Sequence, residues 1–254
     1  MIDTHCHIYY DVYSDDIDRI IENALSGGIE KMICVGVDLQ SSEKCIELSE
    51  KYNCVYASVG YHPHDSKKAP PNYLVELESL SKHNKVVAIG EMGLDFHYNH
   101  SERDIQMQVF REQLDLSKSV SLPAIVHCRE AEKDILKVIE SFNKNLRGVI
   151  HCFSGNLEFA RKIISNHFLI SFTGMITFLD KPFSNVIKNI DIENIMLETD
   201  SPYLTPKPYR GKRNEPSYVK YIAEKISELK NIPINKVDEK TTRNATRLFN
   251  KILN

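Results

Sequence analysis

The run Val86-Val87-Ala88-Ile89-Gly90-Glu91 is a short apolar segment that ends on a carboxylate, and seven other runs of this character are spaced along the chain. Amphipathic segments separate these runs from one another. Alternation of this kind predicts strands joined by helices around a parallel sheet. The eight predicted strands are Met1–His7, Lys31–Val37, Val55–Gly60, Val86–Glu91, Pro123–Cys128, Gly148–Phe153, Phe168–Gly174 and Ile195–Asp200.

Several of the intervening segments carry apolar residues at helical spacing. The helices predicted on this basis are Asp16–Leu25, Ser42–Lys51, Glu102–Ser117, Glu130–Phe142 and Leu157–Ser165. The segment between the seventh and eighth runs has a weaker helical pattern, because Pro182 interrupts it. Two further stretches, Ser217–Lys230 and Asn235–Leu253, are expected to complete an outer ring of helices.

Eight strands with seven helical crossovers favour a closed barrel over an open doubly wound sheet. No G-x-G-x-x-G motif follows the first strand, which argues against a dinucleotide-binding fold. The sequence therefore predicts an α/β fold, a single (β/α)8 TIM barrel that spans residues 1–254 and has an additional C-terminal helix.

Composition limits the function classes. The net charge of the 254-residue chain is −3, which argues against a protein that coats nucleic acid through a strong overall field. The six cysteines form no C-x-x-C pair, and the first residues lack the basic and apolar regions of a signal peptide. No apolar run approaches the length of a membrane span. We therefore expect a cytoplasmic protein with reduced thiols. A monomer is expected as well, although no feature of the sequence determines the oligomeric state.

Metal-competent side chains recur at the ends of the predicted strands. In a barrel, catalytic groups come from these C-terminal strand ends and from the loops that follow. Six such groups buried together without a metal would leave polar atoms unpaired, each at a cost of about 1–3 kcal/mol. A metal centre is therefore favoured over a set of isolated core residues. The six side chains are His5, His7, Glu91, His127, His151 and Asp200.

The spacing of His5-Cys6-His7 supports this interpretation. Residues two apart on a strand point the same way, so both imidazoles can reach one ion. The same alternation turns Cys6 toward the surrounding helices, and it predicts packing for Cys128 and Cys152 as well.

These motifs together carry a family resemblance. The chain resembles the TatD family of metal-dependent deoxyribonucleases, which lies within the larger amidohydrolase-like group of barrels. The matching segments are Ile2-Asp3-Thr4-His5-Cys6-His7, Gly60-Tyr61-His62-Pro63-His64, Gly90-Glu91-Met92-Gly93-Leu94-Asp95, Val126-His127-Cys128-Arg129, His151-Cys152-Phe153-Ser154-Gly155 and Glu198-Thr199-Asp200-Ser201-Pro202-Tyr203-Leu204.

The resemblance implies that all six side chains are metal ligands and that two divalent ions bind. We assign His5, His7 and Asp200 to one ion and His127 and His151 to the other, with Glu91 shared between them. The ligand chemistry leaves Mg, Mn, Zn and Co open. Two such ions activate a water for attack on a phosphodiester, and Asp200 is the group best suited to accept its proton. Glu91 and Asp200 are the predicted catalytic residues.

DNA is the expected substrate, single-stranded or frayed at its ends. The loop after the eighth strand is basic, and Arg210 and Arg213 on it suit a phosphate backbone, as does Arg129, two positions after His127. An ordinary solvated basic turn is the alternative interpretation of this loop. The remaining candidates for substrate contact or support of the ligands are His62, His64, Asp95 and Tyr203, with Phe96 as a further aromatic that could stack on a base.

Two other functions stay open. A hydrolase of a small ester, lactone or amide would use the same fold and ligands, because activated water attacks a carbonyl carbon as readily as phosphorus. A non-catalytic nucleic-acid-binding protein with a structural metal is less favoured. Structural sites are usually closed, four-ligand and rich in cysteine, unlike six mixed ligands.

Overall fold

The computed structural model describes residues 1–253, with the side chains of 180–182 and 253 outside the description, so Asn254 of the predicted domain is not covered. Eight parallel strands form one sheet in the order β1 to β8, which confirms the predicted barrel. They are β1 (Ile2–Cys6), β2 (Lys31–Val35), β3 (Val55–Val59), β4 (Val86–Asp95), β5 (Ala124–Arg129), β6 (Gly148–Ile150), β7 (Phe168–Phe172) and β8 (Ile195–Leu197).

The barrel closes between its last and first strands. Cys6 and Ser201 form a parallel bridge, the N–H of His7 donates to the Ser201 carbonyl at 2.8 Å, and the N–H of Asp200 donates to the His5 carbonyl at 2.9 Å. The closing bonds therefore run through the segment that carries three of the predicted ligands. Asp200 lies three residues beyond the end of β8 rather than at its last position.

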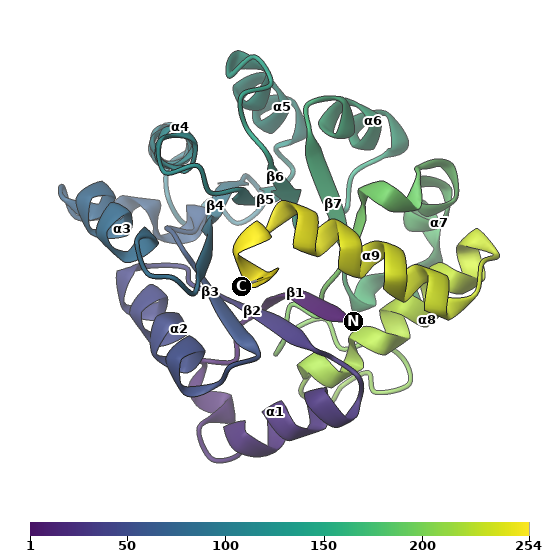
Figure 1. Cartoon of the computed structure of the whole chain (residues 1–254). Coiled ribbons are helices and arrows are strands. Elements are labelled where there is room, and N and C mark those ends of the chain that lie inside the picture. Colours follow the sequence, from purple (N-terminus) through teal and green to yellow (C-terminus); the bar gives the residue numbers. More distant parts are fainter. Residues whose placement is uncertain (254) are drawn as a thin grey trace.

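Eight helices surround the strands (Figure 1). They are α1 (Ile17–Ser26), α2 (Leu39–Lys51), α3 (Tyr73–Ser81), α4 (Arg103–Ser119), α5 (Glu132–Ser141), α6 (Leu157–Ser165), α7 (Asp180–Asn189) and α8 (Val219–Lys230). The sequence did not indicate α3. Pro182 does not prevent α7, because it is the third residue of that helix, where an N–H has no partner within the helix. None of the helices in residues 1–253 is long and apolar enough to cross a membrane.

The last helix, α9 (Ile234–Leu248), corrects one expectation. It does not join the outer ring but crosses the N-terminal end of the barrel, followed by a short 3-10 helix, Asn250–Leu253 (Figure 1). The barrel interior is apolar at this end, and removing those side chains from water favours an apolar cover. The cluster that results contains Ile2, Ile33, Val35, Tyr56, Val87, Ala88, Ile125, Val149, Leu169, Met196, Ala245, Leu248, Phe249 and Ile252.

At the opposite end, β4 approaches β5 closely and extends to Asp95, beyond the predicted end at Glu91. Gly93 has a φ of +137° and pairs with His127, and a Cβ there would lie 2.0 Å from the His127 carbonyl oxygen. A Cβ on Gly90 would lie 2.5 Å from the Ile125 carbonyl oxygen. Glycine at both positions lets the strand that carries Glu91 pack against the strand that carries His127.

Candidate metal centre

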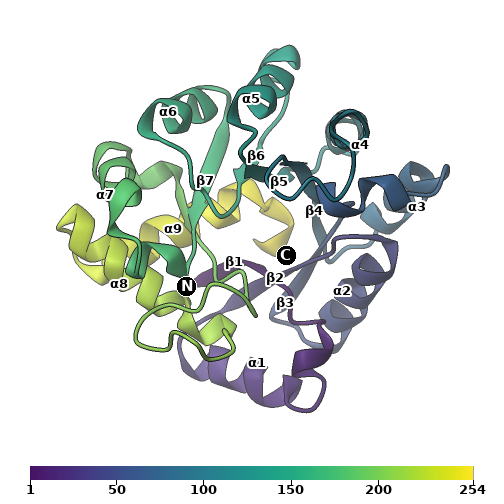
Figure 2. The same cartoon turned by 180° about the vertical axis from the view of Figure 1, so that it is seen from behind.

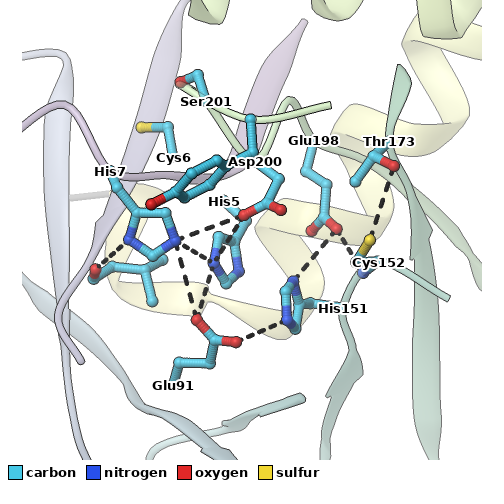
Figure 3. Close-up of polar contacts among 12 residues, drawn as sticks. His5, Cys6, His7, Glu91, His151, Cys152, Thr173, Glu198, Asp200 and Ser201 are labelled. Carbon is cyan, nitrogen blue, oxygen red and sulfur yellow. Dashed lines mark hydrogen bonds and ion pairs between the residues drawn. The ribbon is translucent and has the colours of Figure 1, made fainter. Parts of the chain in front are cut away.

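The six predicted ligands come together at the C-terminal ends of the strands, and Figure 3 shows five of them: His5, His7, Glu91, His151 and Asp200. His5 is in β1 and His7 follows it directly, Glu91 is in β4, His127 is in β5, and His151 follows β6. His5, His7, Glu91 and His151 are all buried. The prediction that these side chains converge is confirmed by their positions, whereas their role as ligands stays a prediction.

The carboxylate of Glu91 lies between two groups of imidazoles. Its Oε2 is 3.3 Å from Nε2 of His5 and 3.9 Å from Nε2 of His7. Its Oε1 is 3.1 Å from Nδ1 of His127 and 2.8 Å from Nε2 of His151. One carboxylate thus offers one oxygen to each group, which is the arrangement that a shared ligand requires.

The group at Oε2 consists of His5, His7 and Asp200. Oδ1 of Asp200 is 3.4 Å from Nε2 of His7 and 3.7 Å from Nε2 of His5. Nδ1 of His7 donates to the Val35 carbonyl at 2.9 Å, so a neutral ring leaves its Nε2 lone pair directed at Asp200 and Glu91. These three residues offer ligand atoms within 4.8 Å of one another, close enough to bind one cation.

Asp200 reaches this position because its backbone adopts a φ of +55°, in the left-handed region. Burial would raise the pKa of Asp200, but His7 and His5 lower it below its usual value. The pKa of His7 is raised, because the Asp200 carboxylate outweighs the effect of burial. The first group therefore contains an ionised carboxylate beside two imidazoles.

The group at Oε1 contains one residue that the sequence did not indicate as a ligand. His62, expected to contact substrate, places Nε2 3.3 Å from Oε1 of Glu91. With Glu91 and His127 it forms a second set of ligand atoms within 4.8 Å. Burial lowers the pKa of His62 to about 4, despite the nearby Glu91, so the ring is neutral near pH 7. Its place three residues after β3 was the signal available in the sequence.

The Asp95 carboxylate fixes the orientation of His127, which belongs to the group at Oε1 of Glu91. Oδ2 of Asp95 is 3.1 Å from Nε2 of His127 and 2.9 Å from Nε2 of His64, so Asp95 joins the two rings. His127 therefore turns Nδ1 toward Glu91. Burial would lower the pKa of His127, but the Asp95 and Glu91 carboxylates outweigh this effect and raise it. Carboxylates behind metal-binding histidines are common, because they set the tautomer of the ring.

Glu198 is a further carboxylate that the sequence did not single out. It is buried, and its Oε1 lies 3.6 Å from Nδ1 of His151 (Figure 3). Its Oε2 accepts a hydrogen bond from Oγ of Ser171 at 2.7 Å. Burial would lower the pKa of His151, but the carboxylates of Glu91 and Glu198 outweigh this effect and raise it well above its usual value. Its spacing, two residues before Asp200 in the Glu198-Thr199-Asp200 motif, was the only signal.

The donor chemistry of this cluster fits divalent cations. Glu91 is buried, yet His151, His62 and His127 lower its pKa well below the usual value, so a charged carboxylate is surrounded by imidazole nitrogens. Nδ1 of His5 has no hydrogen-bond partner although it is buried. No cysteine belongs to the ligand sets found among the described residues, as expected, and Sγ of Cys6 donates to the Ile33 carbonyl at 3.3 Å instead. Imidazole and carboxylate donors of this kind suit Zn, Mn and Co.

The arginines expected at the substrate have different surroundings. The guanidinium of Arg213 donates two hydrogen bonds to the Asp16 carboxylate, at 3.0 and 2.6 Å, and anchors the loop after β8 beside α1 (Figure 2). Arg210 is exposed, with its guanidinium carbon 3.8 Å from the Phe178 ring centroid. Arg129 is exposed, with its guanidinium carbon 4.6 Å from the Tyr98 ring centroid.

The aromatic candidates also differ from each other. The side chain of Tyr203 is 54% exposed, and its ring centroid lies 6.1 Å from that of Tyr10. Phe96 is buried, and the Arg103 guanidinium lies 4.3 Å from its ring centroid. Of the two, only Tyr203 offers a free aromatic surface at the mouth of the barrel.

Comparisons with known proteins identify the family of this chain. A family model described as TatD related DNase matches residues 2–250. The chain is 43% identical over 251 residues to the uncharacterized metal-dependent hydrolase YabD of Bacillus subtilis, covering 98% of each chain. It is 31% identical over 259 residues to the 3'-5' ssDNA/RNA exonuclease TatD of Cronobacter turicensis, covering 99% of this chain and 98% of that one.

A solved structure gives the same assignment. The TatD homologue YjjV of Escherichia coli superposes with a TM-score of 0.93 at 28% identity, over 98% of both chains. The family match covers nearly the whole chain, and the relatives match it from end to end. This chain therefore belongs to the TatD related DNase family and is a metal-dependent hydrolase.

Proposed function

We propose that the protein is a deoxyribonuclease that cleaves DNA phosphodiester bonds with two divalent ions. The observation that carries the proposal is the position of Glu91, whose two carboxylate oxygens face two separate groups of imidazoles. The family description and the name of the Cronobacter relative support a nucleic-acid substrate. That relative's name also leaves RNA open as a second polymer.

The proposed ligands are His5, His7 and Asp200 for one ion and His127 and His151 for the other, with Glu91 shared. His62 is added to the second group because of its contact with Glu91. Bound at this position, Mg, Mn, Zn or Co would supply Lewis-acid polarisation of a phosphate oxygen and of water. Asp95 acts from behind the second group, where it holds the ring of His127 in orientation, and Glu198 places a carboxylate 3.6 Å from Nδ1 of His151.

Asp200 is the proposed proton acceptor. Its pKa is held low by His7 and His5 against the effect of burial, so the carboxylate is ionised when substrate arrives. It accepts a proton from the water whose oxygen bonds to phosphorus, the bond between phosphorus and the leaving oxygen breaks, and Asp200 returns the proton to that leaving oxygen. A carboxylate whose conformation is set by the hydrogen bond from its own N–H to His5 is already positioned for this transfer.

The substrate contacts are proposed from exposure and charge. Arg129 follows His127 by two residues and presents a guanidinium that can donate two hydrogen bonds to a phosphate oxygen pair. Arg210 and Tyr203, on the loop after β8, are exposed as well. His64 is part-buried and can reach substrate from the same face, whereas Asp95 is fully buried between His64 and His127 and supports these rings instead. Arg213 contributes to the same face by holding that loop to Asp16.

The test is a comparison of substrates. Chelator-treated protein would be supplied with Mg, Mn, Zn or Co in turn and assayed on single-stranded, nicked and duplex DNA, on RNA, and on an uncharged aryl ester. We expect metal-dependent cleavage of DNA, fastest on free single strands. The Asp200→Asn variant, purified in parallel, controls for a contaminating nuclease. Hydrolysis of the ester with intact DNA would overturn the proposal in favour of a small-molecule esterase.

A further inference from the structure

The mouth of the barrel carries two exposed aromatic side chains on opposite sides of the metal centre. Tyr98 is 51% exposed and Tyr203 is 54% exposed, and they are the two aromatic members of the large exposed apolar side chains found in the described residues. Tyr98 follows β4, and Tyr203 follows β8. The strand order around the barrel places β4 and β5 across the barrel from β8 and β1. Glu91 and its imidazoles therefore lie between the two tyrosines.

Tyr98 belongs to a stack of planar groups. The ring of His100 lies parallel to it, with an interplanar angle of 4° and 5.5 Å between centroids, and the guanidinium carbon of Arg129 is 4.6 Å from its centroid. All three side chains are exposed. The ring of His97 lies edge-on to that of Tyr98, at 4.7 Å between centroids, and the backbone N–H of Tyr98 donates to Oδ1 of Asp95 at 2.9 Å. A planar base can extend such a stack, and the arginine adds charge for a phosphate.

This stack is connected to the metal centre by direct contacts. The ring of His64 lies 4.7 Å from that of His100 and 5.7 Å from that of Tyr98, centroid to centroid. Nε2 of His64 contacts Asp95, which in turn contacts His127. One histidine and one carboxylate thus separate the stack from a candidate ligand, so a nucleotide next to the reacting phosphate would reach it.

The opposite side has its own aromatic surface. Tyr203 lies edge-on to Tyr10, at 6.1 Å between centroids, and Tyr10 is stacked on His7 at 5.4 Å. On this side too, a single side chain, Tyr10, connects an exposed tyrosine to a candidate ligand. The two sides are alike in offering an aromatic face, but the Tyr98 side also carries a cation.

We propose that Tyr98, with His100 and Arg129, forms a base-binding subsite for one neighbour of the scissile phosphate, while Tyr203 and Tyr10 bind the base on the other side. The inference rests on the proposed nuclease function. Two stacking surfaces on either side of the reacting centre require bases that are unpaired, because a base inside a duplex has both faces covered by its neighbours. The ligand is therefore single-stranded DNA or RNA, recognised without regard to base identity.

The test uses single-stranded oligonucleotides with one abasic nucleotide, placed either on the 5′ or on the 3′ side of the cleaved bond. We expect the parent to lose on the order of 5- to 100-fold in kcat/KM for each abasic position. Tyr98→Ala should become insensitive to the abasic nucleotide on one side only, and Tyr203→Ala on the other side only. Tyr98→Phe keeps the ring and should behave as the parent. Val75→Ala, at an exposed position on α3, is the control for general effects of truncation.

The outcomes separate the two proposals. If the parent cleaves DNA but Tyr98→Ala retains the full parental discrimination, the subsite is wrong and the nuclease function stands. The same holds if both tyrosine variants lose sensitivity on the same side. If the parent cleaves no nucleic acid with any of the metals, the proposed function fails, and the subsite fails with it. Circular dichroism of each variant checks that the fold is unchanged.

Discussion

The two ends of the barrel are built from the same strands with opposite chemistry. On β5, Ile125 packs under α9, and two residues later His127 faces Glu91. Val149 of β6 belongs to the apolar cluster, and His151, directly after β6, belongs to the metal centre. Residues two apart on a strand point to the same side, so both members of each pair face the interior. All four side chains point into the barrel. Their position along the barrel axis therefore decides whether they stabilise the fold or belong to the metal centre.

The largest effect is expected at the polar end. Asp200→Asn should lower kcat by roughly 10²- to 10⁴-fold on a DNA substrate, because an amide cannot accept the proton of the attacking water. The free energy of unfolding of the metal-free protein should change by about 1 kcal/mol or less. Asparagine has nearly the shape of aspartate, and the Asp200 carboxylate lies 3.4 and 3.7 Å from the imidazoles of His7 and His5. Single-turnover kinetics beside urea unfolding measures both. Near-parental turnover at full metal occupancy would remove Asp200 from the mechanism.

The apolar end should respond in the opposite way. Phe249 is fully buried in the cluster between α9 and the strands. Phe249→Ala should reduce the free energy of unfolding by about 3–5 kcal/mol, because it removes a large buried side chain and leaves a cavity. Turnover per folded molecule should stay parental at a temperature where the variant is folded. Phe249→Leu, which fills more of the space, is the matched control and should cost less. A loss of turnover without loss of stability would show that the apolar end also serves the chemistry.

The affinity for metal should depend on pH at the polar end. Burial would lower the pKa of three of the rings, but a nearby carboxylate outweighs this effect and raises it in each case. The pairs are Asp200 for His7, Asp95 for His127, and Glu91 for His151. Rings with raised pKa values hold protons above the usual histidine value of 6.5, and a cation must displace them. Metal affinity should therefore rise as the pH increases above that value, with release of protons. Titration calorimetry in two buffers of different ionisation enthalpy measures the release, and an affinity that falls with pH would contradict the assignment.

The smallest effect is expected at the arginines of the barrel mouth. Arg129→Ala should raise the Michaelis constant for DNA and reduce the magnitude of its salt slope by roughly one unit, as expected for the loss of one phosphate contact. Arg213→Ala should reduce the slope less, because Asp16 already balances the charge of Arg213. DNA cleavage at several salt concentrations decides between them. A larger change of the salt slope for Arg213→Ala than for Arg129→Ala would indicate that Arg213 contacts the DNA backbone directly, as the sequence predicted.

The strands and the metal-competent residues could be predicted from the sequence because both are local signals. Each strand is a short apolar run, and a polar residue such as Glu91 or His127 at its end is visible without knowledge of its neighbours. Features that depend on distant contacts could not be predicted. The amphipathic pattern of α9 shows that one face is buried but not what covers it, and the pairing of Arg213 with Asp16 joins loops that are far apart in the sequence.

The group at Oε1 of Glu91 shows the same limit within the site. His62 follows β3 in the sequence, as the other candidates follow their strands, but its contact with Glu91 depends on how closely β3 and β4 approach. Gly60 permits this approach, since a Cβ there would lie 2.6 Å from the Gly90 backbone. The sequence could identify the residue as functional but could not separate a ligand from a substrate contact.

The proposal that Glu91 is shared by two metal ions is tested most directly by counting the ions that bind. Chelator-treated parent and Glu91→Gln would be titrated with Mn²⁺ by calorimetry at a pH where the imidazoles are neutral, with unfolding temperature as the second readout. We expect two ions per parent chain, a rise in unfolding temperature on binding, and the loss of tight binding of at least one ion in Glu91→Gln, because one amide cannot replace a shared carboxylate. At most one ion in the parent, or two equally tight ions in Glu91→Gln, would contradict it.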